Sequence, residues 1–179
     1  MLIGKNIKLR PLRIEDLEKT HEWRNNLELI KLTKGIRFPK TLEVDREWFN
    51  NALNDRSNRN IYFGIDEIET NDFVGIIQLN SIDYISGISE LGIVFGDINI
   101  KGKGYGKESM KILLNYAFKF LNLRKISLKV IILNERAIFL YKELGFLEEG
   151  RLKRHDYCDG EYNDVIIMSL FKEDYYIGN

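Results

Sequence analysis

A glycine-rich segment between an apolar stretch and an amphipathic stretch constrains this chain more than any other feature. Residues 89–96 predict a short apolar strand, and residues 107–121 carry their apolar side chains on one helical stripe. The segment that joins them alternates glycine with larger residues: Lys101, Gly102, Lys103, Gly104, Tyr105 and Gly106. Glycine lets a backbone approach a ligand closely, and the unpaired N–H groups of a helix's first turn attract anions. We therefore expect a pyrophosphate site on the backbone amides of residues 102–107, with charge added by Lys101, Lys103 and Lys107.

The spacing of the glycines separates this segment from two other phosphate-binding loops. A P-loop ends in Gly-Lys-Ser or Gly-Lys-Thr, and that ending is missing here. A dinucleotide-binding fingerprint requires Gly-x-Gly-x-x-Gly near the start of a βαβ unit, and the spacing differs. A plain strand-to-helix turn remains the alternative to a phosphate site.

The other stretches predict a mixed α/β domain. Alternating apolar residues predict strands at 7–10, 61–65, 73–79 and 125–130, and helical periodicity predicts one or two helices in 14–31 and single helices at 41–53 and 134–144. The C-terminal part predicts a hairpin that turns at Asp159 and Gly160. Because no linker or repeat divides the chain, we expect residues 1–179 to form one domain with a three-layered core.

Composition excludes several classes of protein. Lysine plus arginine equals aspartate plus glutamate at 27 each, which argues against a nucleic-acid partner bound through bulk charge. The single cysteine, Cys158, rules out an internal disulfide, and with His21 and His155 as the two histidines we expect no zinc site. No apolar run is long enough for a signal peptide or a membrane span, so we expect a cytoplasmic protein without a membrane partner.

Two motifs taken together resemble the GNAT superfamily of N-acetyltransferases. The glycine segment resembles the family's Arg/Gln-x-x-Gly-x-Gly/Ala loop, with Lys101 in the place of Arg or Gln. The family's second block, Asn-x-x-Ala-x-x-x-Tyr-x-x-x-Gly-Phe, is present with every spacing kept: Asn134, Ala137, Tyr141, Gly145 and Phe146. Residues 150–170 further resemble the branch that contains ribosomal-protein and spermidine N-acetyltransferases. The resemblance covers essentially the whole chain.

The resemblance implies a fold, a reaction and a cosubstrate site. The fold is a mixed central sheet with a splayed parallel strand pair and helices on both faces, and the reaction transfers acetyl from acetyl-CoA, without a metal, directly to a primary amine. The acetyl group is expected in the gap between strands 89–96 and 125–131. The residues implied to bind the cosubstrate are Ile93, Val94, Phe95, Lys101, Gly102, Lys103, Gly104, Tyr105, Gly106, Lys107, Asn134 and Ala137.

Two residues are the candidates for acid–base catalysis. A lysine-like amine has a pKa near 10.4, so it must lose a proton before it attacks the thioester. Glu90 matches the position of the catalytic glutamate in the histone-acetylating branch and is the candidate base, with a water chain as the alternative. Tyr141 matches the family's catalytic tyrosine and is the candidate acid for the departing thiolate, with a core aromatic as the alternative.

The acceptor is the least constrained part of the prediction. Trp23, Arg24 and Tyr157 are the candidate acceptor-binding residues, since an aromatic and polar lining suits a small polar amine. Arg24 favours an amine that carries a phosphate or carboxylate, such as an amino-sugar or a protein or peptide N-terminus. A spermidine or polyamine acetyltransferase is the alternative, followed by a non-catalytic acyl-CoA-binding module. The chain is expected to be a monomer or a homodimer.

Overall fold

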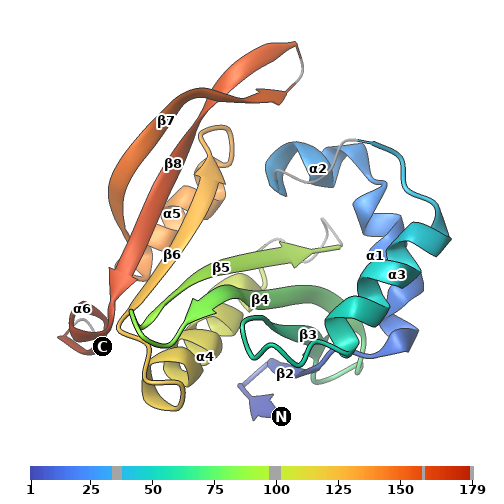
Figure 1. Ribbon diagram of the computed structural model, residues 1–179, viewed down its shortest axis with the longest axis horizontal. Coiled ribbons are helices and arrows are strands. Elements are labelled where there is room, and N and C mark those ends of the chain that lie inside the picture. Colours follow the sequence, from blue (N-terminus) through green and yellow to red (C-terminus); the bar gives the residue numbers. More distant parts are fainter. Residues whose placement is uncertain (34–37, 97–101, 159, 178–179) are drawn as a thin grey trace.

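In the computed structural model, which describes residues 1–33, 38–96, 102–158 and 160–177, the chain forms a sheet of eight strands with helices around it (Figure 1). The strands lie in the order β1-β2-β3-β4-β5-β6-β8-β7. Their bounds are β1 Leu2–Ile3, β2 Ile7–Pro11, β3 Ile61–Glu67, β4 Phe73–Asp83, β5 Ile88–Phe95, β6 Lys125–Ile131, β7 Leu147–Cys158 and β8 Glu161–Phe171. The helices are a 3-10 turn at Ile14–Asp16, then α1 Leu17–Arg24, α2 Leu27–Thr33, α3 Leu42–Leu53, α4 Tyr105–Lys119, α5 Glu135–Glu143 and α6 Lys172–Ile177.

The junction of β5 with β6 is the parallel step in an otherwise antiparallel order. The two strands pair over three positions, and the last of these joins Glu90 to Ser127. Beyond that point β5 continues to Phe95 and β6 to Ile131 without pairing between them. The predicted mixed sheet with a splayed parallel pair is therefore confirmed, and Figure 1 shows β5 and β6 diverging toward the end of the sheet that α2 faces.

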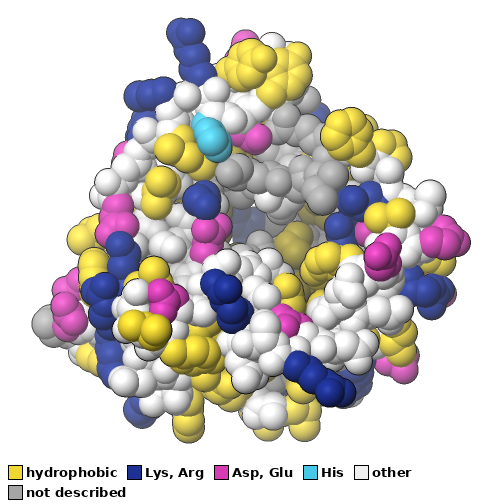
Figure 2. Space-filling view, in the orientation of Figure 1, with side chains coloured by type: hydrophobic (Ala, Val, Ile, Leu, Met, Phe, Trp, Pro, Cys, Tyr) yellow, Lys and Arg dark blue, Asp and Glu magenta, His cyan; other side chains and the backbone are white. Residues whose placement is uncertain are grey.

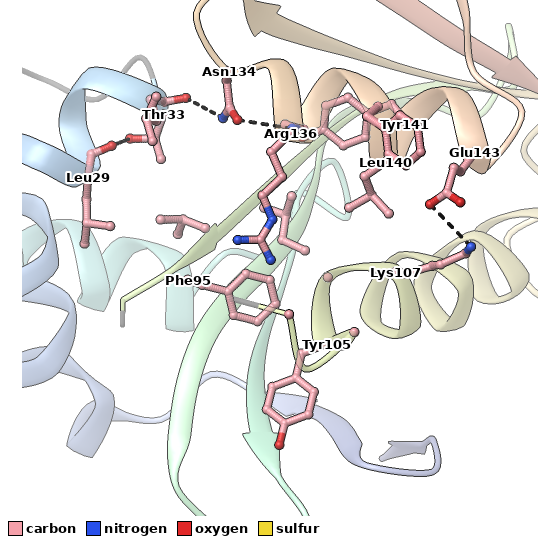
Figure 3. Close-up of a pocket in the computed structure, with 18 of the residues that line it drawn as sticks. Leu29, Thr33, Phe95, Tyr105, Lys107, Asn134, Arg136, Leu140, Tyr141 and Glu143 are labelled. Carbon is pink, nitrogen blue, oxygen red and sulfur yellow. Dashed lines mark hydrogen bonds and ion pairs between the residues drawn. The ribbon is translucent and has the colours of Figure 1, made fainter. Parts of the chain in front are cut away.

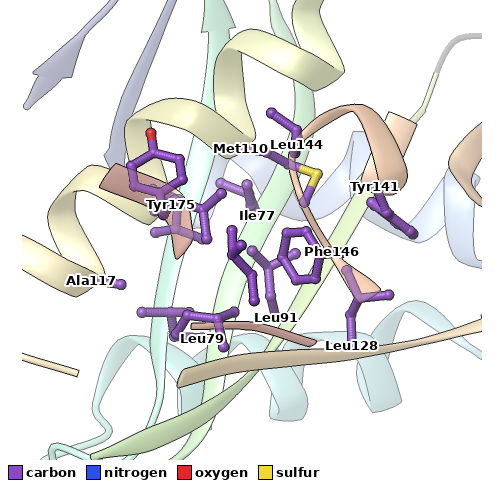
Figure 4. Packing of buried hydrophobic residues seen from close by; sticks show 14 of the residues in the cluster. Ile77, Leu79, Leu91, Met110, Ala117, Leu128, Tyr141, Leu144, Phe146 and Tyr175 are labelled. Atoms are coloured by element: carbon purple, nitrogen blue, oxygen red, sulfur yellow. The ribbon is translucent and has the colours of Figure 1, made fainter. Parts of the chain in front are cut away.

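Helices cover both faces of the sheet, as predicted. Neighbouring residues of β4 point to opposite faces of the sheet, so this strand contributes apolar side chains to the hydrophobic core on each face. Ile77 belongs to the larger core with α4, α5 and α6, where Met110, Phe118 and Phe146 are buried (Figure 4). Ile76 belongs to a smaller core with α1 and α3, together with Leu12, Leu17, Phe49 and Phe73.

Local sequence signals explain where several elements begin and end. The predicted helix at 41–53 begins after Thr41, whose Oγ1 accepts a hydrogen bond from Val44 N at 3.4 Å. Residues 14–31 form a 3-10 turn and two helices, which separate at Asn25. Gly160 adopts a φ of +87° in the predicted hairpin, while Asp159 lies outside the described residues. Among the described residues no helix is both long and apolar enough to cross a membrane.

Candidate active site

A cavity of about 400 Å³ lies between the start of α4, the end of β5 and α5 (Figure 3). We call it the coenzyme cavity. The residues predicted from sequence that line it are Ile93, Val94, Phe95, Gly102, Gly104, Tyr105, Gly106, Lys107, Asn134, Ala137 and Tyr141. They come from three separate stretches of the chain, and the fold brings them together. Lys103 does not line this cavity, and Lys101 lies outside the described residues.

The glycine segment presents open backbone to the coenzyme cavity. Gly102 and Gly104 have φ values of +93° and +81°, a conformation that side-chain-bearing residues rarely adopt. Gly104 is the N-cap of α4, so the first N–H groups of that helix have no partner within it. A Cβ at either glycine would meet nothing within 4 Å, and the space before the loop is therefore free for a ligand. These features fit the predicted pyrophosphate group.

The two described lysines among those predicted, Lys103 and Lys107, are paired with carboxylates. Lys103 Nζ lies 3.2 Å from Glu67 Oε1, and the Tyr105 hydroxyl donates a hydrogen bond to the same carboxylate. These hydrogen bonds, that of Tyr105 first, lower the pKa of Glu67. Lys107 Nζ lies 3.4 Å from Glu143 Oε2 on α5. Lys103 thus faces β3 rather than the cavity, because Glu67 lies on that side.

Asn134 joins α5 to α2. Its Oδ1 accepts a hydrogen bond from Ala137 N at 3.2 Å and caps α5, while its Nδ2 donates to the Leu32 carbonyl at 3.1 Å. Both ends of the amide are therefore occupied within the protein. Each end nevertheless keeps a further position for a ligand, since the amide nitrogen carries two N–H donors and the oxygen two lone pairs.

Sequence reasoning missed four residues of α5 that line the coenzyme cavity, namely Arg136, Phe139, Leu140 and Glu143. They occupy unspecified positions of the Asn-x-x-Ala block, so the motif does not point to them. Helical spacing is the signal that does, since residues 136, 140 and 143 lie on one face of the helix. Figure 3 shows the Arg136 guanidinium extending from α5 toward Phe95 of β5.

Tyr141 combines a buried ring with access to the coenzyme cavity. Its side chain is 8% exposed, and its ring packs 6.0 Å from that of Phe146. Burial raises the pKa of Tyr141 to about 12, because the phenolate is poorly solvated there. The phenol is therefore protonated at neutral pH and can donate a proton.

A second cavity of about 320 Å³ lies on the α1 and α3 face of the sheet. We call it the acceptor cavity. Its lining residues are Thr20, Trp23, Arg24, Leu29, Ile30, Thr33, Trp48, Ile76, Gln78, Gly92, Ile93 and Val94. Four residues line both cavities, namely Leu29, Thr33, Ile93 and Val94. The two cavities thus meet at the end of β5.

Arg24 is held in the wall of the acceptor cavity by two contacts. Its guanidinium carbon lies 4.8 Å from the centre of the Trp48 ring, and its NH1 lies 3.1 Å from Asp45 Oδ1. Asp45 is fully buried and also bonds to His21 Nδ1 at 2.7 Å. His21 is therefore a partner of Asp45 and does not line the cavity.

The two aromatic candidates for the acceptor site differ in position. Trp23 lines the acceptor cavity, stacks on Phe73 at 4.8 Å and covers Gly96 so closely that a Cβ at Gly96 would collide with its ring. Tyr157 lines neither cavity. It lies exposed on β7, where its ring packs 5.1 Å from that of Tyr162. Tyr157 pairs with Tyr162 close to the turn that joins β7 to β8.

Glu90 lies beside the acceptor cavity without lining it. It points to the same face of β5 as Gly92 and Val94, since side chains two residues apart share a face. Its carboxylate is half-exposed and pairs with Lys129. Figure 2 shows this side of the molecule hollowed at its centre, with basic and acidic side chains intermixed around the hollow. Within the described ranges, no three metal-binding side chains of His, Cys, Asp or Glu gather in a cluster.

Comparison with known proteins identifies the class to which this fold and site belong. Residues 6–147 match the family described as the acetyltransferase (GNAT) domain, so the chain belongs to this family. It is an acetyl-CoA-dependent N-acetyltransferase, as predicted from the two motifs.

The relatives with the most extensive matches include spermidine N-acetyltransferases. The chain is 29% identical to the spermidine N(1)-acetyltransferase of Escherichia coli K12 over 170 residues, which cover 95% of this chain and 88% of that protein. It is 30% identical to the Vibrio cholerae enzyme over 173 residues, 97% of each chain. The crystal structure of spermidine N-acetyltransferase from Vibrio cholerae with CoA and spermine superposes with a TM-score of 0.88 at 28% identity, covering 97% of this chain and 99% of that one.

Proposed function

We propose that this enzyme acetylates a primary amine of a polyamine such as spermidine. The observation that carries the proposal is the nearly full-length similarity to spermidine N-acetyltransferases from two bacteria, one of them solved with CoA and spermine. This similarity supports the polyamine reading better than the amino-sugar or peptide N-terminus that the sequence analysis placed first. The cosubstrate is acetyl-CoA.

The proposed reaction uses the meeting point of the two cavities. The amine enters the acceptor cavity, which Trp23 and Trp48 line. Glu90, directly or through water, takes the proton that the amine must lose before its nitrogen attacks the thioester carbonyl. As the carbon–sulfur bond breaks, the Tyr141 hydroxyl gives its proton to the sulfur. The nitrogen loses a second proton as the amide forms, and this proton restores the phenol, while the first proton leaves Glu90 for solvent.

The test is the release of free thiol from acetyl-CoA with spermidine, spermine, peptides with free N-termini and nucleotide-linked amino-sugars as acceptors. We expect kcat/KM to be at least tenfold higher for a polyamine than for any other acceptor. A higher kcat/KM for a peptide or an amino-sugar would overturn the proposal.

Arg24 favours a second candidate, an amine that also carries a phosphate or carboxylate. No carboxylate side chain lines the acceptor cavity among the described residues, whereas the planar guanidinium of Arg24 does. Such a fork binds two oxygens of an anion at once, and a polyamine offers no such group.

The two candidates respond differently to loss of Arg24. For an anion-bearing amine, Arg24→Lys should raise KM because the bidentate contact is lost, and Arg24→Ala should raise it further. For a polyamine, the KM of both variants should stay within a few-fold of the wild type. Arg46→Ala is the matched control, because Arg46 is exposed on α3 and lines neither cavity.

A further inference from the structure

The two basic side chains that line the coenzyme cavity differ in their partners. Lys107 pairs with Glu143 across the cavity wall at 3.4 Å. Arg136 has no carboxylate partner among the described residues, and its side chain is exposed. In Figure 3 its guanidinium projects from the first turn of α5 into the space before Phe95, while Lys107 turns toward Glu143. Arg136 is thus a cation placed in the cavity without a counter-charge from the described part of the chain.

The acidic residues of the same cavity are neutralised by neighbours. Glu143 is held by Lys107, and Glu28 on α2 lies 3.1 Å from Lys31. Neither carboxylate therefore repels an anion strongly. Lys103, the other described lysine of the glycine segment, forms an ion pair with Glu67 outside the cavity. The glycine segment itself then supplies neutral backbone donors rather than charge.

Coenzyme A carries several negative charges, on its pyrophosphate and on its 3′-phosphate. Backbone N–H groups at a helix start bind such groups through partial charges. A guanidinium adds a full charge and a planar fork that matches two phosphate oxygens, and charge-assisted bonds of this kind are roughly twice as strong as neutral ones.

We propose that Arg136 binds a phosphate group of the cosubstrate from the α5 side, opposite the backbone donors of the glycine segment. The phosphate is then held between the first turns of α4 and α5. The inference rests on the use of acetyl-CoA and not on which amine is acetylated. It also gives Arg136 the role, added positive charge, that the sequence suggested for Lys101, Lys103 and Lys107.

The proposal is tested by calorimetric binding of CoA, without any amine, to the wild type, Arg136→Ala and Arg136→Lys. We expect Arg136→Ala to raise the Kd for CoA at least tenfold and Arg136→Lys to recover part of the loss. The matched control is Lys142→Ala, because Lys142 is exposed on the same helix and does not line the cavity. Alanine is the best helix former, so neither alanine variant should unfold α5.

Two truncated ligands identify the phosphate. With 3′-dephospho-CoA, the effect of Arg136→Ala should disappear if the guanidinium binds the 3′-phosphate and persist if it binds the pyrophosphate. With pantetheine, which has no phosphate, the variant and the wild type should bind alike. An unchanged Kd for CoA in Arg136→Ala, or an equal loss with pantetheine, would overturn the proposal. Because no acceptor is present, these results do not depend on whether a polyamine is the substrate.

Discussion

Glu90 accepts a hydrogen bond from Lys129 Nζ at 2.8 Å, at the place where β5 and β6 stop pairing. Glu90 faces Asn80 on one side and Ser127 on the other, and beyond it the two strands separate. The carboxylate therefore lies at the closed end of the gap between β5 and β6. The ammonium of Lys129 already pairs with it.

This arrangement predicts the effect of Glu90→Gln. If Glu90 accepts the proton of the amine, kcat should fall by about 10² or more, since a positioned base contributes on that scale. The Kd for acetyl-CoA should not change, because Glu90 does not line the coenzyme cavity. The control is Glu149→Gln, whose carboxylate pairs with Lys125 at 2.6 Å between neighbouring parts of the sheet. Similar kcat values for the two variants would assign the proton transfer to a water chain instead.

Tyr141→Phe should lower turnover far more than binding. The variant keeps the ring that packs on Phe146 and removes the hydroxyl that we propose protonates the leaving sulfur. We expect kcat to fall about 10²–10⁴-fold with an almost unchanged Kd for CoA. Steady-state rates and calorimetry measure the two quantities. Tyr157→Phe is the control, because the Tyr157 hydroxyl lies outside both cavities. If Tyr141→Phe had the kcat of the wild type, Tyr141 would contribute only packing and no proton.

The raised pKa of Tyr141 also predicts a loss of stability at alkaline pH. The phenol ionises near its ordinary value of 10.0 in the unfolded chain but only at about 12 in the folded one. The unfolded state therefore releases this proton first, and the free energy of unfolding falls as the pH rises above 10. Between about pH 9 and pH 11 the wild type should lose about 1 kcal/mol more than Tyr141→Phe, since a tenfold change in proton affinity is worth about 1.4 kcal/mol. Urea unfolding of both proteins across this range measures the difference, and parallel curves would contradict it.

Gly104→Val should raise the Kd for acetyl-CoA at least tenfold while the protein stays folded. The new side chain would project into the open space before the glycine segment and would strain a backbone with a φ of +81°. Gly160→Val separates the two effects, because Gly160 has a φ of +87° and the same open surroundings in the distant β7–β8 turn. It should cost similar stability and leave the Kd unchanged. If folded Gly104→Val bound acetyl-CoA as tightly as the wild type, the glycine segment would not be part of the cosubstrate site.

Much of the coenzyme side of the site was predictable because its signals are local. The φ values of Gly102 and Gly104 and the capping by Asn134 depend on residues a few positions apart. The spacing from Ala137 to Tyr141 is one turn of a helix, so both side chains reach the same side of it. Alternating apolar residues likewise predicted strands at 7–10, 61–65, 73–79 and 125–130, and the sheet contains strands at all four places.

The sequence by itself thus determined the family, the glycine segment and the helix that carries Tyr141. Tertiary structure decided which charges remain available, because an ion pair depends on residues that approach only after folding. Lys103 meets Glu67 and Arg24 meets Asp45 across long stretches of chain, while Arg136 meets no carboxylate among the described residues. Tertiary structure also placed Tyr157 outside both cavities, on the β7–β8 ladder. Spacing along one element predicts which side chains share a face, but the partner of a charge is set by the packing of elements against one another.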